Sequence, residues 1–253
     1  MGTHYSLNKE PAFLEKRFGA RFDQDFERVY HVSGFNNPSM PVITDEAPDK
    51  FSFLKWGLVP FWLKDKEQIK YVRIKTLNAR SDTLFEKPSF KVPVRKRRCL
   101  IVTDGYFEWR EVAGKTYPYY IHMKDNDAFA LAGIWDEWRD EKNMEKLQAF
   151  SIISVDANPF IKKINNRHQR MPVILPKKDE RTWIRSDLGE ESIKSMLQTY
   201  EGKELEAYPV KRLIGKKDVN SNTPEILEKC SYDELKNLDE KKEQENLKQL
   251  TLF

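Results

Sequence analysis

The chain has 253 residues, of which 39% are hydrophobic and 12% aromatic, enough to fill a substantial core. It contains no run of about 18 or more apolar residues, and its N-terminal segment lacks the charged-then-apolar pattern of a secretory signal. These features argue against a membrane-bound or exported protein. We therefore expect a cytoplasmic protein that folds by itself.

The charge is unevenly distributed along the chain. The net charge is +4, but residues 225–253 hold eight acidic and five basic residues, so this segment carries −3 and residues 1–224 carry +7. A basic body favours a polyanion such as nucleic acid, although a charge surplus also promotes solubility. Cys99, Cys230 and the four histidines show no disulfide or metal-ligand spacing, and no Walker, dinucleotide or zincin motif occurs. We expect no cofactor and no metal.

The pattern of apolar residues predicts a mixture of helices and strands. Asn8 is a candidate N-cap for a helix over residues 9–17, with Gly19 as its end. Short β-branched and aromatic runs between prolines and glycines then predict strands. These predicted strands cover residues 40–43, 51–59, 98–103, 106–110, 117–123, 128–135, 149–155 and 171–175.

A second helix is predicted over residues 179–200, where Trp183, Ile184, Ile193 and Met196 are the apolar positions. The predicted class is therefore α+β. No repeat or Gly/Ser-rich linker divides the first 224 residues, which predicts one domain over residues 1–224. A charged, helix-prone C-terminal extension is expected over residues 225–253.

Two groups of residues combine aromatic, glycine and polar side chains in a way that suits nucleic acid. In Trp56-Gly-Leu-Val-Pro-Phe-Trp62 a tryptophan can stack on a base, or both can fill the core. In Asn78-Ala-Arg-Ser-Asp82 the polar side chains can bind a sugar-phosphate, or close turns and cap helices.

A third group, Asp104-Gly-Tyr-Phe-Glu-Trp109, places Glu108 between two aromatic rings. Burial there would raise the carboxyl pKa toward a value useful for proton transfer. The alternative is a carboxylate paired with Arg98 or Arg110 on a solvated strand.

Two further groups are rich in arginine. Arg167-His-Gln-Arg-Met-Pro172 flanks an imidazole with guanidinium groups, which suits a phosphate-lined site, although a single histidine is often structural. The run Arg95-Lys-Arg-Arg98 is either a track for phosphates or a solvated patch.

Taken in chain order, these groups and the segment Asp156-Ala-Asn-Pro159, which precedes Arg167-His-Gln-Arg-Met-Pro172, resemble the SOS-response-associated peptidase (SRAP) family over residues 5–220. The resemblance implies a single α+β domain with a curved, barrel-like β-core flanked by helices, and a basic groove for single-stranded DNA. In that family the initiator methionine is removed to expose a cysteine. Its amine and thiol react with the aldehyde of an abasic site to form a thiazolidine crosslink.

The resemblance also implies roles for individual residues. By motif, Asn78 matches the residue that positions the nucleophile and sugar, Glu108 the active-site acid, and His168 the histidine that helps open and protonate the sugar. The residues that match DNA contacts are Arg80 and Arg170, for phosphates, and Trp62, for the groove.

The chain departs from the family at residue 2, where Gly2 replaces the nucleophilic cysteine. An engineered change, a cloning alteration and a natural paralogue without the thiol are the three possible origins. A thiazolidine cannot close without the sulfur, but the α-amine, with a pKa of about 7.7 to 8.0, can still attack the aldehyde. We expect a transient Schiff base and slow β-elimination, with Gly2, Asn78, Glu108 and His168 as catalytic residues and Glu108 and His168 handling the protons. Cys99, in an apolar strand, is not expected to replace the thiol.

The last five residues, Gln249-Leu-Thr-Leu-Phe253, resemble the motif that binds the bacterial sliding clamp. The resemblance assigns the contacts to Gln249, Leu250, Leu252 and Phe253. Such binding would bring the protein to the nucleoid and its replication forks. In the alternative, these residues fold back and pack on the domain.

Three functions are compatible with the sequence. The first is an abasic-site processing enzyme with crosslinking or lyase activity that also removes its own methionine. The second is a non-catalytic module that binds single-stranded DNA. The third, a peptidase acting on other proteins, would need the missing cysteine. We expect a monomer in each case.

Overall fold

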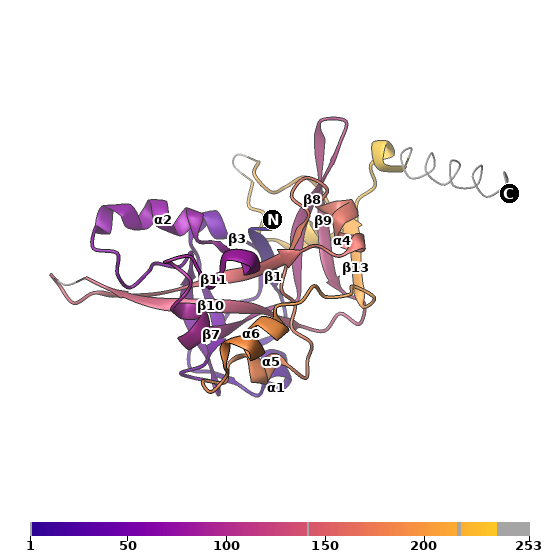
Figure 1. The fold of residues 1–253 in the computed structure, drawn as a ribbon. Coiled ribbons are helices and arrows are strands. Elements are labelled where there is room, and N and C mark those ends of the chain that lie inside the picture. Colours follow the sequence, from indigo (N-terminus) through magenta and orange to yellow (C-terminus); the bar gives the residue numbers. More distant parts are fainter. Residues whose placement is uncertain (1, 141, 217–218, 237–253) are drawn as a thin grey trace.

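The computed structural model describes residues 2–140, 142–216 and 219–236, and Figure 1 shows their arrangement. The strands are β1 (His4–Leu7), β2 (Arg21–Phe22), β3 (Val29–Ser33), β4 (Ser39–Thr44), β5 (Lys50–Trp56), β6 (Asn78–Arg80), β7 (Arg98–Thr103), β8 (Gly105–Val112), β9 (Lys115–Met123), β10 (Phe129–Arg139), β11 (Lys146–Asp156), β12 (Arg170–Pro172) and β13 (Leu205–Pro209). The helices are α1 (Pro11–Phe18), α2 (Ile69–Lys75), α3 (Pro93–Lys96), α4 (Pro159–Ile164), α5 (Glu180–Trp183) and α6 (Glu190–Met196). The 3₁₀ turns are η1 (Gly34–Asn36), η2 (Lys66–Gln68), η3 (Ser81–Thr83) and η4 (Pro224–Leu227).

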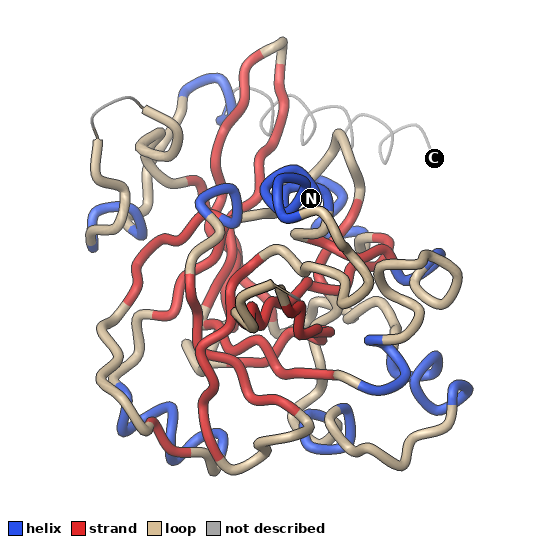
Figure 2. The backbone as a smooth tube through the Cα atoms, turned by 90° about the vertical axis from the view of Figure 1, so that its left-hand side faces the viewer, coloured by secondary structure: helices blue, strands red, loops and turns tan. Residues whose placement is uncertain are grey.

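A closed ring of five strands forms the core. Strand β10 pairs with β7 and β11, and β4 pairs with β7 and β5, all antiparallel. A parallel contact between β5 and β11 closes the ring, with Trp56 opposite Phe150. Figure 2 shows the strands at the centre and the helices around them. The predicted α+β class with a barrel-like core flanked by helices is confirmed.

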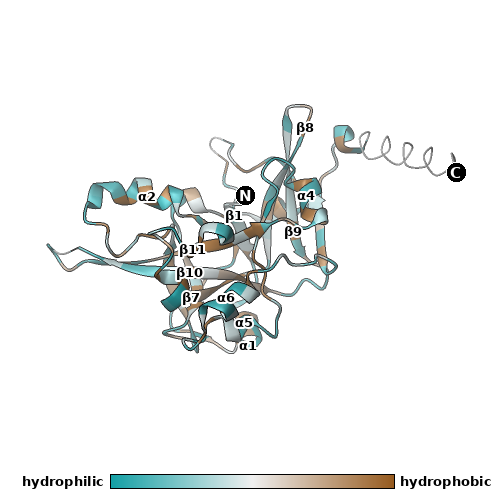
Figure 3. Cartoon of the chain, viewed as in Figure 1, coloured by the Kyte–Doolittle hydropathy of each residue, from teal (hydrophilic) through white to brown (hydrophobic). Residues whose placement is uncertain are grey.

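The barrel interior is crowded and apolar. Every residue of β7 is buried, which explains the continuous apolar run in its sequence. A Cβ atom at Gly133 would lie 2.5 Å from Cδ1 of Ile101 and 2.8 Å from Sγ of Cys99, so a larger residue at this point of β10 would require these side chains to shift. In Figure 3 the central part of β11 is hydrophobic, whereas the outer end of the β10–β11 hairpin is hydrophilic.

The second sheet has the strand order β13-β9-β8-β1-β3 and holds the amino terminus. Within it, Tyr5 of β1 lies opposite Tyr106 of β8 and Val32 of β3. Because β1 and β8 are antiparallel, the residues before Tyr5 run beside those after Tyr106. The backbone N–H of Gly34 also donates to the carbonyl of Thr3 at 2.8 Å. The strand pairing therefore brings the amino terminus to Glu108.

The two predicted helices differ in detail from the observed ones. Helix α1 begins at Pro11, whose fixed φ suits the first helical turn, and Glu10 rather than Asn8 precedes it. The N–H of Asn8 instead donates to Asp104 Oδ2 at 3.1 Å. The single helix predicted over residues 179–200 is wrong. Two short helices, α5 and α6, occupy this segment, and Gly189 precedes the second.

Some residues beyond 224 contact the domain. Ile226 in η4 is buried, and the hydroxyl of Tyr232 donates to the carbonyl of Val210 at 2.7 Å. The division at residue 224 stays a prediction.

Residues 237–253, including the four predicted clamp contacts, lie outside the described residues. Among the described helices, none is both long and apolar enough to span a membrane.

Candidate active site at the amino terminus

The amino-terminal backbone meets a buried carboxyl group. The nitrogen of Gly2 donates to Oε1 of Glu108 at 2.5 Å, and Glu108, in β8, is only 2% exposed. Burial raises the pKa of Glu108 to about 7, although the positive amino terminus and hydrogen bonds from Gly2 and Asn165 oppose this shift. The alternative of a solvated Glu108 is therefore wrong. A carboxyl group with this pKa exchanges protons readily at neutral pH.

Glu108 and His168 line the same pocket, which has a volume of about 300 Å³. His168 lies in the turn after α4, where Gln169 has a φ of 52° and its N–H donates to the carbonyl of Asn165 at 2.9 Å. The positive charge of the amino terminus, followed by partial burial and Arg167, lowers the pKa of His168. The structure thus brings together three predicted residues, Gly2, Glu108 and His168.

Asn165 is a member of this site that the sequence analysis missed. Its side chain is 2% exposed, lines the pocket, and donates from Nδ2 to the carbonyl of Arg170 at 2.8 Å. Its Oδ1 accepts from the N–H of His168 at 3.3 Å. Asn165 therefore links the pocket to β12. Its only local sequence signal was its place at the C-terminal end of a short helix.

Asn78 lies on β6, which pairs in parallel with β11. Its Oδ1 is buried and has no hydrogen-bond partner among the described residues. A buried acceptor without a partner is costly unless something else satisfies it. Asn78 does not line the pocket that contains Glu108 and His168.

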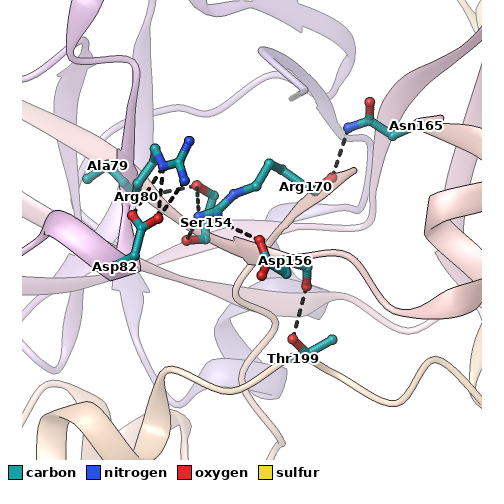
Figure 4. Close-up of polar contacts among 8 residues, drawn as sticks. All are labelled: Ala79, Arg80, Asp82, Ser154, Asp156, Asn165, Arg170 and Thr199. Atoms are coloured by element: carbon teal, nitrogen blue, oxygen red, sulfur yellow. Dashed lines mark hydrogen bonds and ion pairs between the residues drawn. The ribbon is translucent and has the colours of Figure 1, made fainter. Parts of the chain in front are cut away.

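The two predicted phosphate-binding arginines flank β11, with Arg80 opposite Ser154 and Arg170 opposite Asp156 (Figure 4). Arg80 is exposed and pairs with Asp82. Arg170 is 9% exposed and donates to Asp156 Oδ1 at 2.8 Å and to the carbonyl of Ser154 at 2.6 Å. The two guanidinium groups therefore differ greatly in their access to a ligand.

The two tryptophans of the first motif also differ. Trp56 is fully buried and donates from Nε1 to the carbonyl of Leu77 at 2.9 Å, so it belongs to the core. Trp62 is 46% exposed and lies outside the residues that line the pocket. An exposed indole retains a face on which a base can stack.

The other candidate groups for chemistry do not enter this site. Cys99 is fully buried, and burial raises the pKa of its thiol well above the ordinary value, so it is not an activated nucleophile. Among the described residues, no three His, Cys, Asp or Glu side chains are grouped so that they could hold a metal ion.

The fold therefore combines a closed barrel with an amino-terminal segment that is bonded to a buried carboxyl group beside an accessible histidine. The family model for the SOS response associated peptidase (SRAP) matches residues 1–217. The chain belongs to the SRAP family.

Named relatives and solved structures agree with this assignment. The chain is 36% identical to the abasic site processing protein YoqW of Bacillus subtilis (strain 168), over 80% of this chain and 88% of the relative. It is 32% identical to the abasic site processing protein HMCES of Gallus gallus, over 69% of this chain and 56% of the relative. A Bacteroides thetaiotaomicron protein of solved structure aligns with a TM-score of 0.85 and 36% identity, covering 90% of this chain and 100% of that one.

Proposed function

We propose that this protein processes abasic sites in single-stranded DNA, and that the α-amine of Gly2 attacks the aldehyde of the open sugar. The observation that carries the proposal is the hydrogen bond of 2.5 Å between the Gly2 nitrogen and the buried Glu108. Removal of the initiator methionine would turn this nitrogen into a free amine beside a carboxyl group whose pKa is raised by burial. The names of the relatives YoqW and HMCES support the same substrate.

The proposed chemistry begins with a bond between the amine nitrogen and C1′ of the sugar. Glu108 accepts a proton from the nitrogen, and His168 assists in opening the sugar. Loss of water then gives a Schiff base. Removal of a C2′ proton breaks the bond to the 3′ phosphate, which nicks the strand by β-elimination. No thiazolidine forms, because Gly2 carries no sulfur.

The DNA is proposed to run past Arg80 and Trp62, both of which are accessible. Arg80 can exchange its exposed partner Asp82 for a phosphate at little cost. A phosphate contact by Arg170 requires replacement of its bond to Asp156. Asn78, whose buried Oδ1 has no partner among the described residues, is proposed to orient the sugar or the nucleophile.

A second candidate is a module that shields lesions without a stable crosslink. A Cβ atom at residue 2 would lie 2.8 Å from the carbonyl oxygen of Phe107 and 3.2 Å from Oε1 of Glu108. The first distance is too short for a carbon–oxygen contact, so a cysteine here requires the backbone to shift.

The test incubates the chain and its Gly2→Cys variant with a single-stranded oligonucleotide that carries one abasic site. Denaturing gels are run with and without borohydride, which reduces a Schiff base to a stable amine. Intact mass confirms that the initiator methionine has been removed. The matched controls are the same oligonucleotide without the lesion and the Glu108→Gln variant.

We expect the glycine chain to give an adduct only with borohydride, and the cysteine variant to give a heat-stable adduct without it. Glu108→Gln should lower the rate of both by a factor of about 10² to 10⁴, typical of a lost acid–base group. Absence of any adduct from either chain would overturn the catalytic proposal. Binding of the lesion strand without an adduct would then establish the shielding module.

We further infer that Gln249, Leu250, Leu252 and Phe253 bind a bacterial sliding clamp. These residues lie outside the described part of the chain, so the inference rests on their resemblance to the clamp-binding motif alone. The charged residues before them would act as a tether. Such a contact would deliver the protein to replication forks, where single strands are exposed.

A further inference from the structure

A chain of three side chains leads from the half-buried Ser221 to the amino-terminal pocket. Nδ1 of His4 lies 2.9 Å from Nε2 of His31, and Nδ1 of His31 lies 2.7 Å from Oγ of Ser221. The two imidazole planes differ by only 11°. Both contacts have hydrogen-bond geometry, so the three groups form one continuous hydrogen-bonded chain.

The surrounding residues hold this chain in place. The ring of His4 contacts Trp109 edge-on, with 5.0 Å between centroids, and His31 contacts Phe107 in the same way at 5.4 Å. The residue after Ser221 is anchored to β3. Oδ1 of Asn222 accepts from the N–H of His31 at 3.2 Å and from that of Tyr30 at 2.8 Å, and these bonds keep Ser221 beside His31.

The pocket end of the chain is His4. It lines the same pocket as Glu108 and His168, two residues from Gly2. Its Nδ1 is occupied by His31, whereas its Nε2 is bonded to none of the described residues. Nε2 is therefore the atom that His4 has available for a molecule bound in the pocket.

The hydrogen bonds couple the two ring tautomers. A neutral imidazole has one N–H and one acceptor nitrogen. If Ser221 donates to His31, then His31 Nε2 donates to His4, and His4 presents an N–H to the pocket. If His31 instead donates to Ser221, His4 donates to His31 and its Nε2 presents an acceptor to the pocket. Burial, reinforced by the proximity of His31, lowers the pKa of His4 to about 3, and burial lowers that of His31 to about 4, which keeps both rings neutral.

We propose that Ser221, His31 and His4 form a proton relay between solvent and the amino-terminal pocket, with His4 acting on the substrate and the other two acting through it. The relay rests on the proposed function, since it serves the reaction of the Gly2 amine with an aldehyde.

The relay acts at the dehydration step. After the amine has added to C1′, the carbinolamine must lose its hydroxyl group as water. The C–O bond breaks with its electron pair on oxygen, and this oxygen takes the proton of His4 Nε2. His4 Nδ1 takes the proton of His31 Nε2, and His31 Nδ1 takes that of Ser221. Ser221 regains a proton from a hydronium ion of the solvent, which becomes water. The nitrogen lone pair completes the C=N bond of a protonated Schiff base.

The test measures borohydride trapping on the abasic oligonucleotide at increasing protein concentration, which separates the maximal rate constant from half-saturation. His4→Ala should lower the maximal rate about 10²-fold and leave half-saturation unchanged. Added imidazole should restore part of the rate in this variant and have no effect on the wild-type chain. Ser221→Ala should cause a smaller loss, roughly 10-fold, because water can replace its hydroxyl group.

A proton inventory distinguishes a relay from a structural role. Rates in mixtures of H₂O and D₂O should depend non-linearly on the deuterium fraction for the wild-type chain, since several protons move together. His31→Phe, which keeps an aromatic ring beside Phe107, should make this dependence linear. Thermal melting checks that each variant folds.

A second measurement does not depend on activity. In the ¹⁵N-histidine spectrum of the wild-type protein, His4 and His31 should show a coupling across their shared proton, and Ser221→Ala should shift their tautomer balance. An unchanged rate in His4→Ala, or the absence of this coupling, overturns the relay while the proposed function stands. If the wild-type chain forms no trapped adduct, both fall together.

Discussion

At the scale of the residue, Glu108 depends most on its surroundings. A glutamate on an ordinary strand surface would be ionised at neutral pH, but this one is 2% exposed and contacts the amino terminus. In the proposed reaction, which first removes and later returns a proton, its raised pKa would let this one group serve as both base and acid. The neighbouring His168 is accessible, and the positive amino terminus lowers its pKa.

Glu108 also links stability to pH. Its pKa rises from 4.5 to about 7 on folding, so the folded protein holds the proton more tightly than the unfolded chain. This contribution to stability is fully present below a pH of about 4.5 and is lost as the pH rises through about 7. Glu108→Gln removes the dependence. We expect its melting temperature, relative to that of the wild-type chain, to rise with pH between about 5 and 8.

Melting curves of both proteins at matched ionic strength measure this difference. The control is Glu191→Gln, a change at an exposed helical position, which should follow the wild-type curve. Parallel curves for the wild-type chain and Glu108→Gln across this range would show that the carboxyl group is ionised in the folded protein.

At the scale of the element, the strands β6 and β12 both pair with β11, and each carries one arginine in a different environment. Arg170 joins β12 to β11 through Ser154 and Asp156, whereas Arg80 projects from the edge strand β6 toward solvent. The resemblance to the family assigned phosphates to both. Their contacts favour Arg170 mainly as a brace between strands and Arg80 as the more available phosphate ligand.

Replacing each arginine by alanine should separate these roles. Arg170→Ala should lower the free energy of unfolding by about 1.5–3 kcal/mol, because charge-assisted hydrogen bonds near the core are lost. Arg80→Ala should leave melting nearly unchanged but reduce the slope of log affinity against log salt by about 0.7, the effect of one lost phosphate contact on a single strand. Denaturant titrations and fluorescence anisotropy measure the two quantities. Equal effects of both changes on stability would contradict this division.

At the scale of the whole molecule, the sequence separates a basic body from an acidic C-terminal segment. Residues 1–224 carry +7 and residues 225–253 carry −3. In the proposed function, the basic body would attract DNA to the site and the acidic segment would disfavour binding of the terminal motif to the same DNA. The described residues after 224 return to the domain through Ile226 and Tyr232.

Replacement of Leu252 and Phe253 by alanine should abolish binding to a bacterial sliding clamp, since two apolar anchors are removed. The melting temperature and the trapped adduct should not change. Surface plasmon resonance on immobilised clamp measures the interaction, and Leu247→Ala, just before the motif, is the matched control. Clamp binding that survives the double change would contradict the assignment of the motif.

Much of the fold could be predicted from local patterns. Apolar runs marked most of the barrel strands, because a strand buried on both faces needs side chains of one kind. Gly19 marked the end of α1 correctly, since its φ of 58° suits glycine. The prediction of one helix over residues 179–200 was wrong, because the apolar positions of this segment are divided between two short helices that contact the core separately.

The sequence by itself determined the family, the α+β class and the absence of a thiol at residue 2, because each depends on residue identity and order. Only the tertiary structure decided that Gly2 meets Glu108, since strand register brings together residues more than a hundred positions apart. Asn165 and the His4–His31 pair escaped notice for the same reason. Their neighbours in sequence carry no signal, and their chemistry arises from contacts between strands and turns that only folding creates.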